Sequence, residues 1–392
     1  MNKREFLKLS SAAIAGGLIS VKTKAKTLSA SLLTKEPIFR NLGKTGIKVP
    51  IISSGGLPLD NPALVREIFK SGIKHFDSAL SYQNGRNDAM IGEMLKEFGR
   101  DNFVISTKVN LPTDKETGQY KSDATTKLFL EKLDESLKLQ GVEYIDILYL
   151  QAPPTRAAAL NEEMLNGMRK AKELGKTRHV GVATHSNQLE VINAAIESKL
   201  YEVVVVSYNF RLENTVKPAL ARATNAGLGI VAMKTLAGGF LDKEKQKPIN
   251  KSAALKWVLQ DKNVHTAIMS IHSSADLELF KSSMYDIKMS PEEEKDIQSY
   301  SQTAGLYCHG CEECKPQCPY GLPIPDLMRS FMYTYGYGEP AKAREVIESL
   351  TLGNQICGNC PVCNVQCKNG FNVADRIKDV IRLRDVPTEF LV

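Results

Sequence analysis

The chain has no cysteine before Cys308, and all eight of its cysteines lie between Cys308 and Cys367. A disulfide framework spread over the whole fold is therefore excluded, and the cysteines form one local feature. The sequence also lacks an apolar run of about 20 residues, the length that a membrane-spanning helix needs, so no stable membrane span is expected. No Gly-x-Gly-x-x-Gly motif follows the first predicted strand, which argues against a doubly wound dinucleotide-binding sheet.

Little net positive charge remains once the first 30 residues are set aside. The 392-residue chain has a formal net charge of +7, but six Lys or Arg against one Glu in residues 1–30 account for five of those charges. The remaining excess of two is too small to indicate a nucleic-acid partner. With 43% hydrophobic and 24% charged residues, the chain is globular and can bury a substantial core.

The first 30 residues have the layout of a signal peptide. A basic start at residues 2–8 precedes a short apolar run at 9–21 and a polar stretch at 22–30 with alanines suited to cleavage. Residues 3–8, Lys-Arg-Glu-Phe-Leu-Lys, resemble the twin-arginine export motif with lysine in place of the first arginine. We expect export to the periplasm by this route, because the lysines after the apolar run hinder general secretion. An ordinary secretion signal and an amphipathic N-terminus are the alternatives.

Short apolar runs alternate with helical patterns over most of the remaining chain. A hairpin is expected at residues 39–49, around a glycine-flanked turn. The eight runs expected as strands are residues 51–53, 74–77, 103–108, 145–150, 179–183, 203–207, 229–232 and 266–269. Eight successive strand–helix units predict an α/β fold, a closed (β/α)8 TIM barrel with an N-terminal hairpin. An open doubly wound sheet is the alternative.

Two helix ends are marked in the sequence. Gly141 follows an apolar stripe that ends at Leu137, which predicts a left-handed C-cap. Asn187 stands three residues before Glu190, which predicts a capping box at the start of another helix.

Polar side chains stand at the ends of three neighbouring predicted strands. Asp77 ends the second strand, Lys108 ends the third and Gln151 follows the fourth, while Tyr82 lies in the loop after Asp77. Because catalytic groups of such barrels lie at the C-terminal ends of the strands, we expect these four side chains to face one mouth. The alternative is a structural ion pair between Asp77 and Lys108, with Tyr82 as a loop aromatic.

Four separated motifs together resemble the aldo-keto reductase superfamily over about residues 38–285: those at residues 42–46, 75–82, 105–108 and 144–150. The resemblance implies a tetrad of Asp, Tyr, Lys and His that works with a nicotinamide cofactor, and Asp77, Tyr82 and Lys108 match it. Tyr82 would then exchange a proton with a carbonyl or alcohol oxygen, and Lys108 would lower its pKa from about 10.

The sequence departs from the family at the fourth position of the tetrad, where Gln151 replaces histidine. An amide donates a hydrogen bond to a substrate oxygen but cannot shuttle a proton as imidazole does. We therefore expect substrate orientation to be kept and part of the acid–base chemistry to be lost. His75, His179 and His265 lie in or beside predicted strands and are expected to be packed residues.

The resemblance also implies cofactor contacts, at Ala183, Thr184, Ser207, Tyr208, Lys234, Leu236, Gly238 and Ser270. Ala183 and Thr184 replace the usual Ser-Asn pair that holds the carboxamide. Residues 270–276, where the family clamps the adenosine 2′-phosphate, contain no Arg or Lys and end in Asp276, which repels phosphate. The sequence therefore favours NADP(H) binding at the nicotinamide end and disfavours it at the adenosine end.

The cysteines form two copies of the pattern Cys-x2-Cys-x2-Cys-x3-Cys, at Cys308, Cys311, Cys314 and Cys318 and at Cys357, Cys360, Cys363 and Cys367. This doubled spacing is similar to that of bacterial two-cluster ferredoxins and indicates two 4Fe-4S clusters. Structural zinc usually takes two Cys-x2-Cys knuckles, and disulfides between such close neighbours would be crowded; both are alternatives.

In such ferredoxins the fourth cysteine of each run ligates the other cluster. The resemblance therefore implies that one cluster is bound by Cys308, Cys311, Cys314 and Cys367. It implies that the other is bound by Cys357, Cys360, Cys363 and Cys318. Helical patterns at residues 325–333 and 339–350 fill the spacer, so a small helical ferredoxin-like domain is expected.

The sequence thus divides into a signal peptide (1–30), a barrel (31–300) and a cluster domain (301–392). We predict an exported iron-sulfur oxidoreductase that acts on a carbonyl or alcohol, including sugars, and passes electrons to an unidentified redox partner. One alternative is a barrel that has lost turnover and serves as a ligand-binding or electron-transfer module. Another is a cytoplasmic NADPH-dependent reductase.

Overall fold

The computed structural model describes residues 36–55, 59–114, 117–185, 187–242, 244–303, 305–350, 352, 357, 360 and 363–391. The predicted signal peptide lies outside these residues. From Pro37 onward the chain forms one compact unit, so the predicted boundary at residue 300 stays a prediction.

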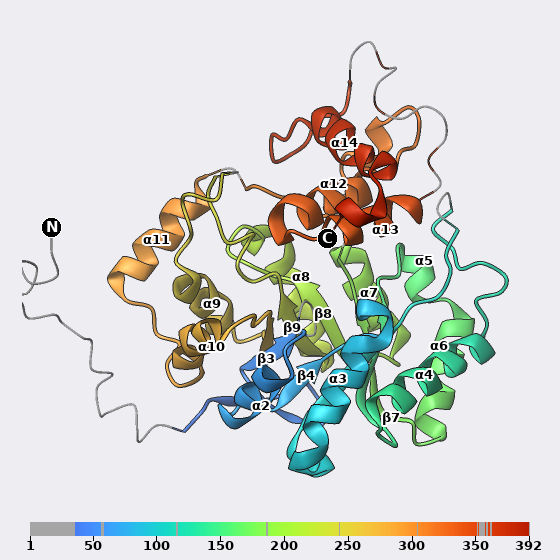
Figure 1. Ribbon diagram of the computed structural model, residues 1–392, viewed down its shortest axis with the longest axis vertical. Coiled ribbons are helices and arrows are strands. Elements are labelled where there is room, and N and C mark those ends of the chain that lie inside the picture. The colour runs from blue at the N-terminus through green and yellow to red at the C-terminus, as the bar shows by residue number, and fades with distance from the viewer. Residues whose placement is uncertain are drawn as a thin grey trace, which may run out of the picture. The chain divides into compact units, whose positions relative to one another are not determined.

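Eight parallel strands close into a barrel at the centre of the molecule's helices (Figure 1). Their order around the barrel is β10-β3-β4-β5-β6-β7-β8-β9. They are β3 (Ile52–Gly55), β4 (His75–Asp77), β5 (Val104–Val109), β6 (Ile145–Gln151), β7 (Thr177–Ala183), β8 (Val203–Ser207), β9 (Gly229–Met233) and β10 (Thr266–Met269). The strands are buried almost throughout, because one face meets the barrel interior and the other meets the helices. The predicted (β/α)8 barrel is confirmed, and the open sheet is wrong.

A hairpin precedes the barrel, as the sequence predicts. Its strands, β1 (Phe39–Asn41) and β2 (Lys48–Pro50), pair antiparallel. A Cβ atom at Gly43, whose φ is +55°, would lie 2.4 Å from the backbone nitrogen of Gly229. Only glycine therefore lets the hairpin turn approach the start of β9 this closely.

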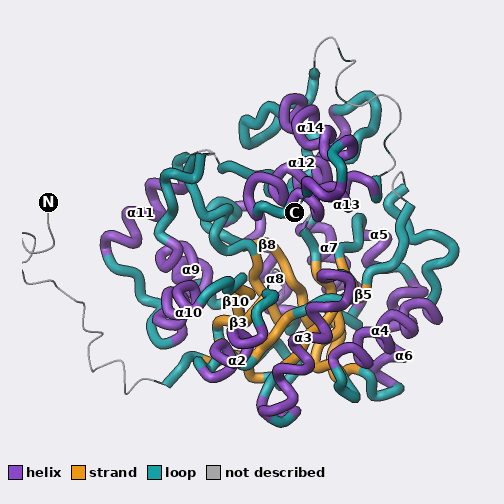
Figure 2. The backbone as a smooth tube through the Cα atoms, viewed as in Figure 1, coloured by secondary structure: helices purple, strands orange, loops and turns teal. Residues whose placement is uncertain are grey.

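Helices surround the strands on the outside of the barrel (Figure 2). They are α2 (Pro62–Lys70), α3 (Arg86–Leu95), α4 (Thr126–Gln140), α5 (Arg156–Ala159), α6 (Glu162–Glu173), α7 (Gln188–Ser198), α8 (Glu213–Ala226), α9 (Lys251–Gln260), α10 (Ser274–Lys281) and α11 (Pro291–Ser301). Within the described part of the chain, no helix is both long enough and apolar enough to cross a membrane.

The two predicted helix ends have different outcomes. Gly141 ends α4 with φ +63°, which confirms the left-handed cap. The capping box at Asn187 is wrong, because Asn187 has φ +54° and its side chain makes no capping hydrogen bond. Its backbone N–H instead donates to the Gly310 carbonyl at 3.2 Å, so a contact distant in the sequence sets the start of α7.

The C-terminal segment, by which we mean the predicted cluster domain at residues 301–392, is helical over much of its described part, as expected. It contains α12 (Ile324–Met332), a π-helical turn (Tyr333–Tyr337), α13 (Pro340–Glu348) and α14 (Val373–Ile381). These helices enclose a hydrophobic cluster of their own, centred on Leu327, Ile347 and Ile377. The segment therefore has a core distinct from the barrel core.

Candidate active site

Asp77, Lys108 and Tyr82 meet at the C-terminal end of the strands. Asp77 ends β4 and Lys108 lies near the end of β5; their charged groups form an ion pair whose side chains are only 4% and 5% exposed. The Lys108 ammonium also donates to the Ser78 carbonyl at 2.7 Å. It lies 5.0 Å from the centroid of the Tyr82 ring. A buried ion pair and a partly exposed phenol thus lie together at this end of the barrel.

The electrostatics keep Tyr82 protonated and Lys108 charged. Burial raises the pKa of Tyr82, and the charge and hydrogen bond of Lys108 offset only part of that effect. Burial lowers the pKa of Lys108, but Asp77 and Tyr82 raise it above its ordinary value. The expected net lowering of the Tyr82 pKa is therefore wrong. At neutral pH the pair is an ammonium beside a neutral phenol, which suits Tyr82 to donate a proton.

A series of hydrogen bonds between buried side chains leads from Asp77 into the barrel interior. Ser106 Oγ donates to Asp77 Oδ1 at 2.6 Å and lies 3.1 Å from His75 Nε2. His75 Nδ1 lies 2.9 Å from Ser53 Oγ, which lies 2.6 Å from Thr266 Oγ1. Burial lowers the pKa of His75 to about 4, so the ring is neutral. Since Ser106 gives its proton to the carboxylate, Nε2 of His75 must carry the hydrogen and Nδ1 must accept from Ser53.

His75 was expected only to pack, and its hydrogen bonds to Ser106 and Ser53 were found in the structure. The relevant signal is the strand register, which sets Asp77 beside Ser106. His75 and Asp77 are two residues apart on β4 and therefore face the same side.

Gln151 lies at the end of β6, where Ser81 fixes its amide. Ser81 Oγ donates to Gln151 Oε1 at 3.1 Å. Because this bond uses the amide oxygen, the NH2 group is the part of Gln151 that can donate to a ligand oxygen. Sequence reasoning did not single out Ser81.

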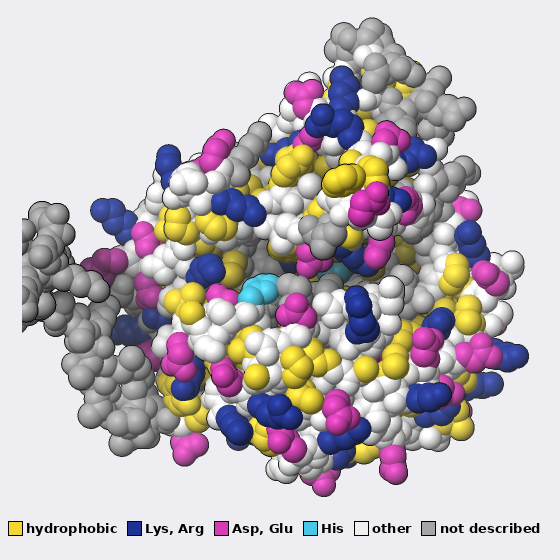
Figure 3. Space-filling view, viewed as in Figure 1, with side chains coloured by type: hydrophobic (Ala, Val, Ile, Leu, Met, Phe, Trp, Pro, Cys, Tyr) yellow, Lys and Arg dark blue, Asp and Glu magenta, His cyan; other side chains and the backbone are white. Residues whose placement is uncertain are grey.

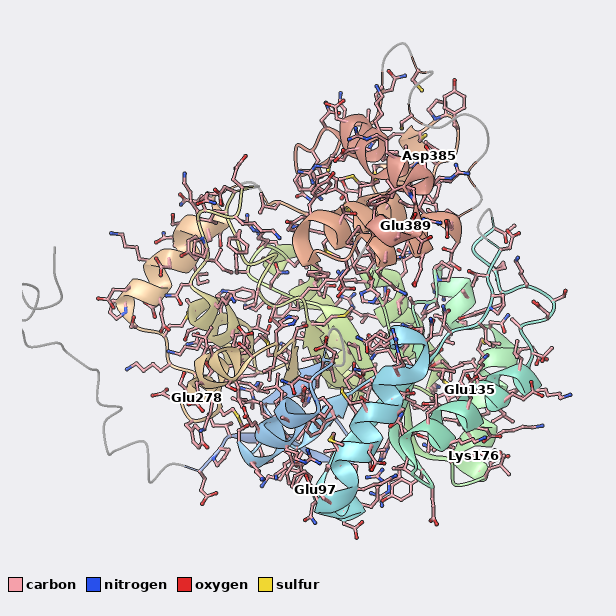
Figure 4. The ribbon with its side chains drawn as sticks, in the orientation of Figure 1. Glu97, Glu135, Lys176, Glu278, Asp385 and Glu389 are labelled. Atoms are coloured by element: carbon pink, nitrogen blue, oxygen red, sulfur yellow. The ribbon has the colours of Figure 1, made fainter. Side chains whose placement is uncertain are left out.

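The charged residues outside the mouth are arranged differently. Glu97, Glu135 and Lys176 lie on the outer surface (Figure 4), and each pairs with another exposed or partly exposed side chain. Charges of both signs are interspersed over the face in Figure 3. Such surface pairs contribute about 0–1 kcal/mol each, whereas breaking a buried pair such as Asp77–Lys108 has larger energetic consequences.

Three of the expected cofactor residues, Ser207, Lys234 and Gly238, line a cavity of about 40 Å³. The rest of its wall comes from the barrel loops and from the C-terminal segment: His185, Asn209, Leu212, Ala237, Tyr307, Cys308, His309, Met332 and Tyr337. The buried atoms Ser207 Oγ and His185 Nδ1 have no hydrogen-bond partner among the described residues. Burial, with Arg329 adding to it, lowers the pKa of Lys234 to about 7.

The other expected cofactor residues do not line this cavity. Ala183 and Thr184 are buried at the end of β7, Leu236 packs partly buried on the barrel core, and Ser270 is exposed after β10. Tyr208 is fully buried; its ring centroid is 5.3 Å from that of Trp257 and its hydroxyl donates to Asp261 at 2.7 Å. Its ring thus belongs to the barrel wall and presents no free face for stacking.

The eight cysteines carry no disulfide and fall into two interacting sets. In the first, the thiol of Cys314 interacts electrostatically with Cys308, Cys311 and Cys367. In the second, the thiol of Cys357 interacts with Cys318, Cys360 and Cys363. The sets have the same members as those implied by the ferredoxin spacing.

Burial raises the pKa of Cys308 and raises that of Cys314 to about 12, so these thiols are neutral without a metal. No group of three or more His, Cys, Asp or Glu within the described ranges is already placed to hold a metal ion. Metal binding by these cysteines therefore stays a prediction.

Comparison with curated proteins finds several related chains. This chain is 31% identical over 220 residues to L-glyceraldehyde 3-phosphate reductase of Escherichia coli (strain K12), a match that covers 52% of this chain and 62% of that protein. It is 26% identical over 226 residues to L-galactose dehydrogenase of Arabidopsis thaliana, covering 52% and 67% of the two chains. It is 31% identical over 229 residues to a probable voltage-gated potassium channel subunit beta of the same plant, covering 53% and 67%. The match spans less than two thirds of the bacterial reductase.

Solved structures and family membership agree on the barrel. A holo aldo-keto reductase from Bacillus halodurans superposes with a TM-score of 0.58 at 19% identity, covering 70% of this chain and 100% of that one. A thermostable aldo-keto reductase solved with the inhibitor epalrestat gives 0.54 at 22% identity, covering 67% and 99%. These low identities establish the fold alone. Residues 60–254 match the Aldo/keto reductase family, and together with the relatives above this shows that the chain belongs to that family.

Proposed function

We propose that the protein is an oxidoreductase that interconverts a carbonyl and an alcohol, with sugars among its substrates. The observation that carries the proposal is the buried Asp77–Lys108 pair beside the protonated phenol of Tyr82. The names of two relatives, a glyceraldehyde 3-phosphate reductase and a galactose dehydrogenase, support a sugar-like substrate.

The chain's own groups account for the proton chemistry at the substrate oxygen. In the direction of reduction, the carbonyl takes up two electrons and two protons. An external donor supplies the two electrons and the proton that reaches the carbon, and Tyr82 donates the other proton to the oxygen as that oxygen gains negative charge. The Lys108 ammonium stabilises the phenolate that forms, and Asp77 keeps Lys108 charged and in place. The NH2 group of Gln151 donates to the same oxygen and orients the substrate. In the direction of oxidation these transfers reverse: the alcohol proton passes to the phenolate form of Tyr82, and an external acceptor takes the two electrons and the proton that leave the carbon.

We further propose that the eight cysteines bind two 4Fe-4S clusters, one for each set of four thiols. The support is the doubled spacing, together with the electrostatic grouping of the thiols around Cys314 and Cys357. Thiolates are the ligands that such clusters take. When bound, the clusters would supply one-electron transfer to an unidentified redox partner.

Export is the third part of the proposal, and it rests on the basic, apolar and polar stretches of residues 1–30. The twin-arginine route carries folded proteins, which suits a chain that receives its clusters before export. Fractionation of a producing strain that lacks the twin-arginine translocase tests this part. We expect the periplasmic pool to disappear, and undiminished export would overturn the route.

The catalytic proposal is tested by Tyr82→Phe, assayed on a panel of sugar aldehydes and alcohols with a dye as one-electron donor or acceptor. We expect turnover to fall by about 10²–10⁴-fold, the usual contribution of a positioned proton donor. The electron paramagnetic resonance signal of the reduced protein should stay unchanged. Full turnover in Tyr82→Phe would instead favour the second candidate, a barrel that serves as a binding or electron-transfer module.

A further inference from the structure

We propose that the C-terminal segment fills the groove in which this family would bind its nicotinamide dinucleotide, so that the full chain binds neither NADPH nor NADH. The inference concerns the groove alone. If it holds, the electrons of the reaction proposed above come from a donor other than a nicotinamide. The inference follows from the space, the contacts and the charges on one side of the barrel mouth.

The first observation is the lack of space. Ser207, Lys234 and Gly238 are the expected cofactor residues that share a cavity, and that cavity measures about 40 Å³. Sites for drug-sized ligands measure about 300–1,000 Å³, and a dinucleotide is larger than most such ligands. The cavity is therefore too small for a dinucleotide.

The second observation is what takes up the space. A Cβ atom at Gly238, whose φ is +98°, would lie 2.7 and 2.8 Å from two atoms of the Tyr307 ring. On the other side, a Cβ atom at Gly336 would lie 3.1 Å from Cζ of Tyr307. Tyr307 is 9% exposed and packs in one cluster with Met332. The bare backbone at Gly238, which the resemblance assigns to the pyrophosphate, is therefore covered by Tyr307.

Hydrogen bonds fasten the segment to the loops that follow three successive strands. After β7, the Asn187 N–H donates to the Gly310 carbonyl at 3.2 Å. After β8, Arg211 Nη2 donates to Thr303 Oγ1 at 3.1 Å. After β9, Lys245 Nζ donates to the Gly336 carbonyl at 3.3 Å. These bonds lie on the side of β7 to β9, whereas the catalytic residues come from β4 to β6.

The charged side chains at both ends of the groove also disfavour a bound dinucleotide. Lys234, which would face a pyrophosphate, instead lies in the cavity wall with Cys308 and interacts with it electrostatically. At the adenosine end, the carboxylate of Asp276 lies 3.7 Å from Lys251 and accepts from the Ser273 hydroxyl at 3.1 Å. A 2′-phosphate there would meet a carboxylate that already pairs with the nearest lysine.

The test is titration of the cluster-loaded full chain with NADPH and with NADH, by isothermal calorimetry and by nicotinamide fluorescence. Binding weaker than about 1 mM is expected for both. A saturable isotherm in the micromolar range would overturn the proposal.

Two variants ask whether the segment is the cause. Tyr307→Ala and Met332→Ala remove side chains from the cavity wall, and at least one should bind NADPH about tenfold or more tighter than the parent chain. Tyr335→Ala is the matched control, because Tyr335 is 43% exposed and lies outside the cavity lining. Weak binding by the parent and by both variants would show that the barrel lacks the site whatever covers it, and would also overturn the proposal.

Folding of each variant is checked by its cluster signal, and each is also assayed with the one-electron dye. The Tyr82→Phe variant tests the proposed reaction through its dye-linked turnover. This substitution is not expected to change dinucleotide binding. Turnover measurements can therefore refute the proposed reaction, and titrations can refute the filled groove, each without the other.

Discussion

Removing the Lys108 charge should expose the energetic cost of the buried ion pair. Lys108→Met keeps a long side chain but leaves the Asp77 carboxylate in a site where its side chain is 4% exposed. Among the described residues, the Ser106 hydroxyl then remains as a side-chain donor to it. Breaking one partner of a buried pair costs about 3–5 kcal/mol, because an uncompensated charge stays in a poorly solvated place. We expect a loss of that size in the free energy of unfolding.

The assay is urea unfolding followed by far-ultraviolet circular dichroism, with Lys176→Met as the matched control. Lys176 also pairs with a carboxylate, that of Asp134, but the two side chains are 27% and 52% exposed. A pair of this kind contributes about 0–1 kcal/mol. The double variant Asp77→Leu with Lys108→Met should recover part of the stability, because no unpaired charge remains, and it should still be inactive. A loss below about 1 kcal/mol for Lys108→Met would refute the reasoning.

Three further predictions address the neighbours of this pair and the cysteines. Gln151→His should raise carbonyl turnover and add a pKa near 6.5 to the pH–rate profile, since imidazole can shuttle a proton; an unchanged profile would contradict it. Wild type should lose about 3 kcal/mol of stability as the pH falls from 6.5 to 4, because the unfolded chain protonates His75 before the folded one does; urea unfolding at several pH values should show this dependence weakened in His75→Asn. Cys308→Ser should reduce bound iron from about eight to about four atoms per chain, measured by iron and sulfide analysis; zinc with no paramagnetic signal would contradict the cluster proposal.

The fold was predictable because its signal is local and repeated. The barrel strands are buried almost throughout, so several appear in the sequence as short apolar runs, such as residues 203–207, which are β8 without change. Boundaries moved where the hydrogen-bond ladder extends past the apolar run, as at β7, which begins at Thr177 and not at residue 179. Gly141 was predictable for the same reason, since a left-handed cap depends on the residue itself.

The parts of the site that were missed depend on contacts across strands. His75 carries no local mark of its role, which comes from the register that sets Asp77 beside Ser106. The net pKa of Tyr82 also required the structure, because burial opposes the nearby ammonium and the sequence gives no measure of burial. Tyr208 keeps its place after β8, but its packing against Trp257 is a tertiary contact.

The structure also explains why the two halves of the barrel mouth should be considered separately. Tyr82, Lys108 and Gln151 come from the side of β4 to β6, where Tyr82 and Gln151 stay partly exposed. On the side of β7 to β9, the groove is bounded by the C-terminal segment around Tyr307. A family member that keeps the proton-transfer residues while filling its dinucleotide groove needs another source of electrons. Cys308, a cysteine of the first set, lines the same cavity as Lys234, so a cluster bound there as proposed would adjoin the barrel loops. Under the proposal made above, one segment both covers the groove and carries the cysteines.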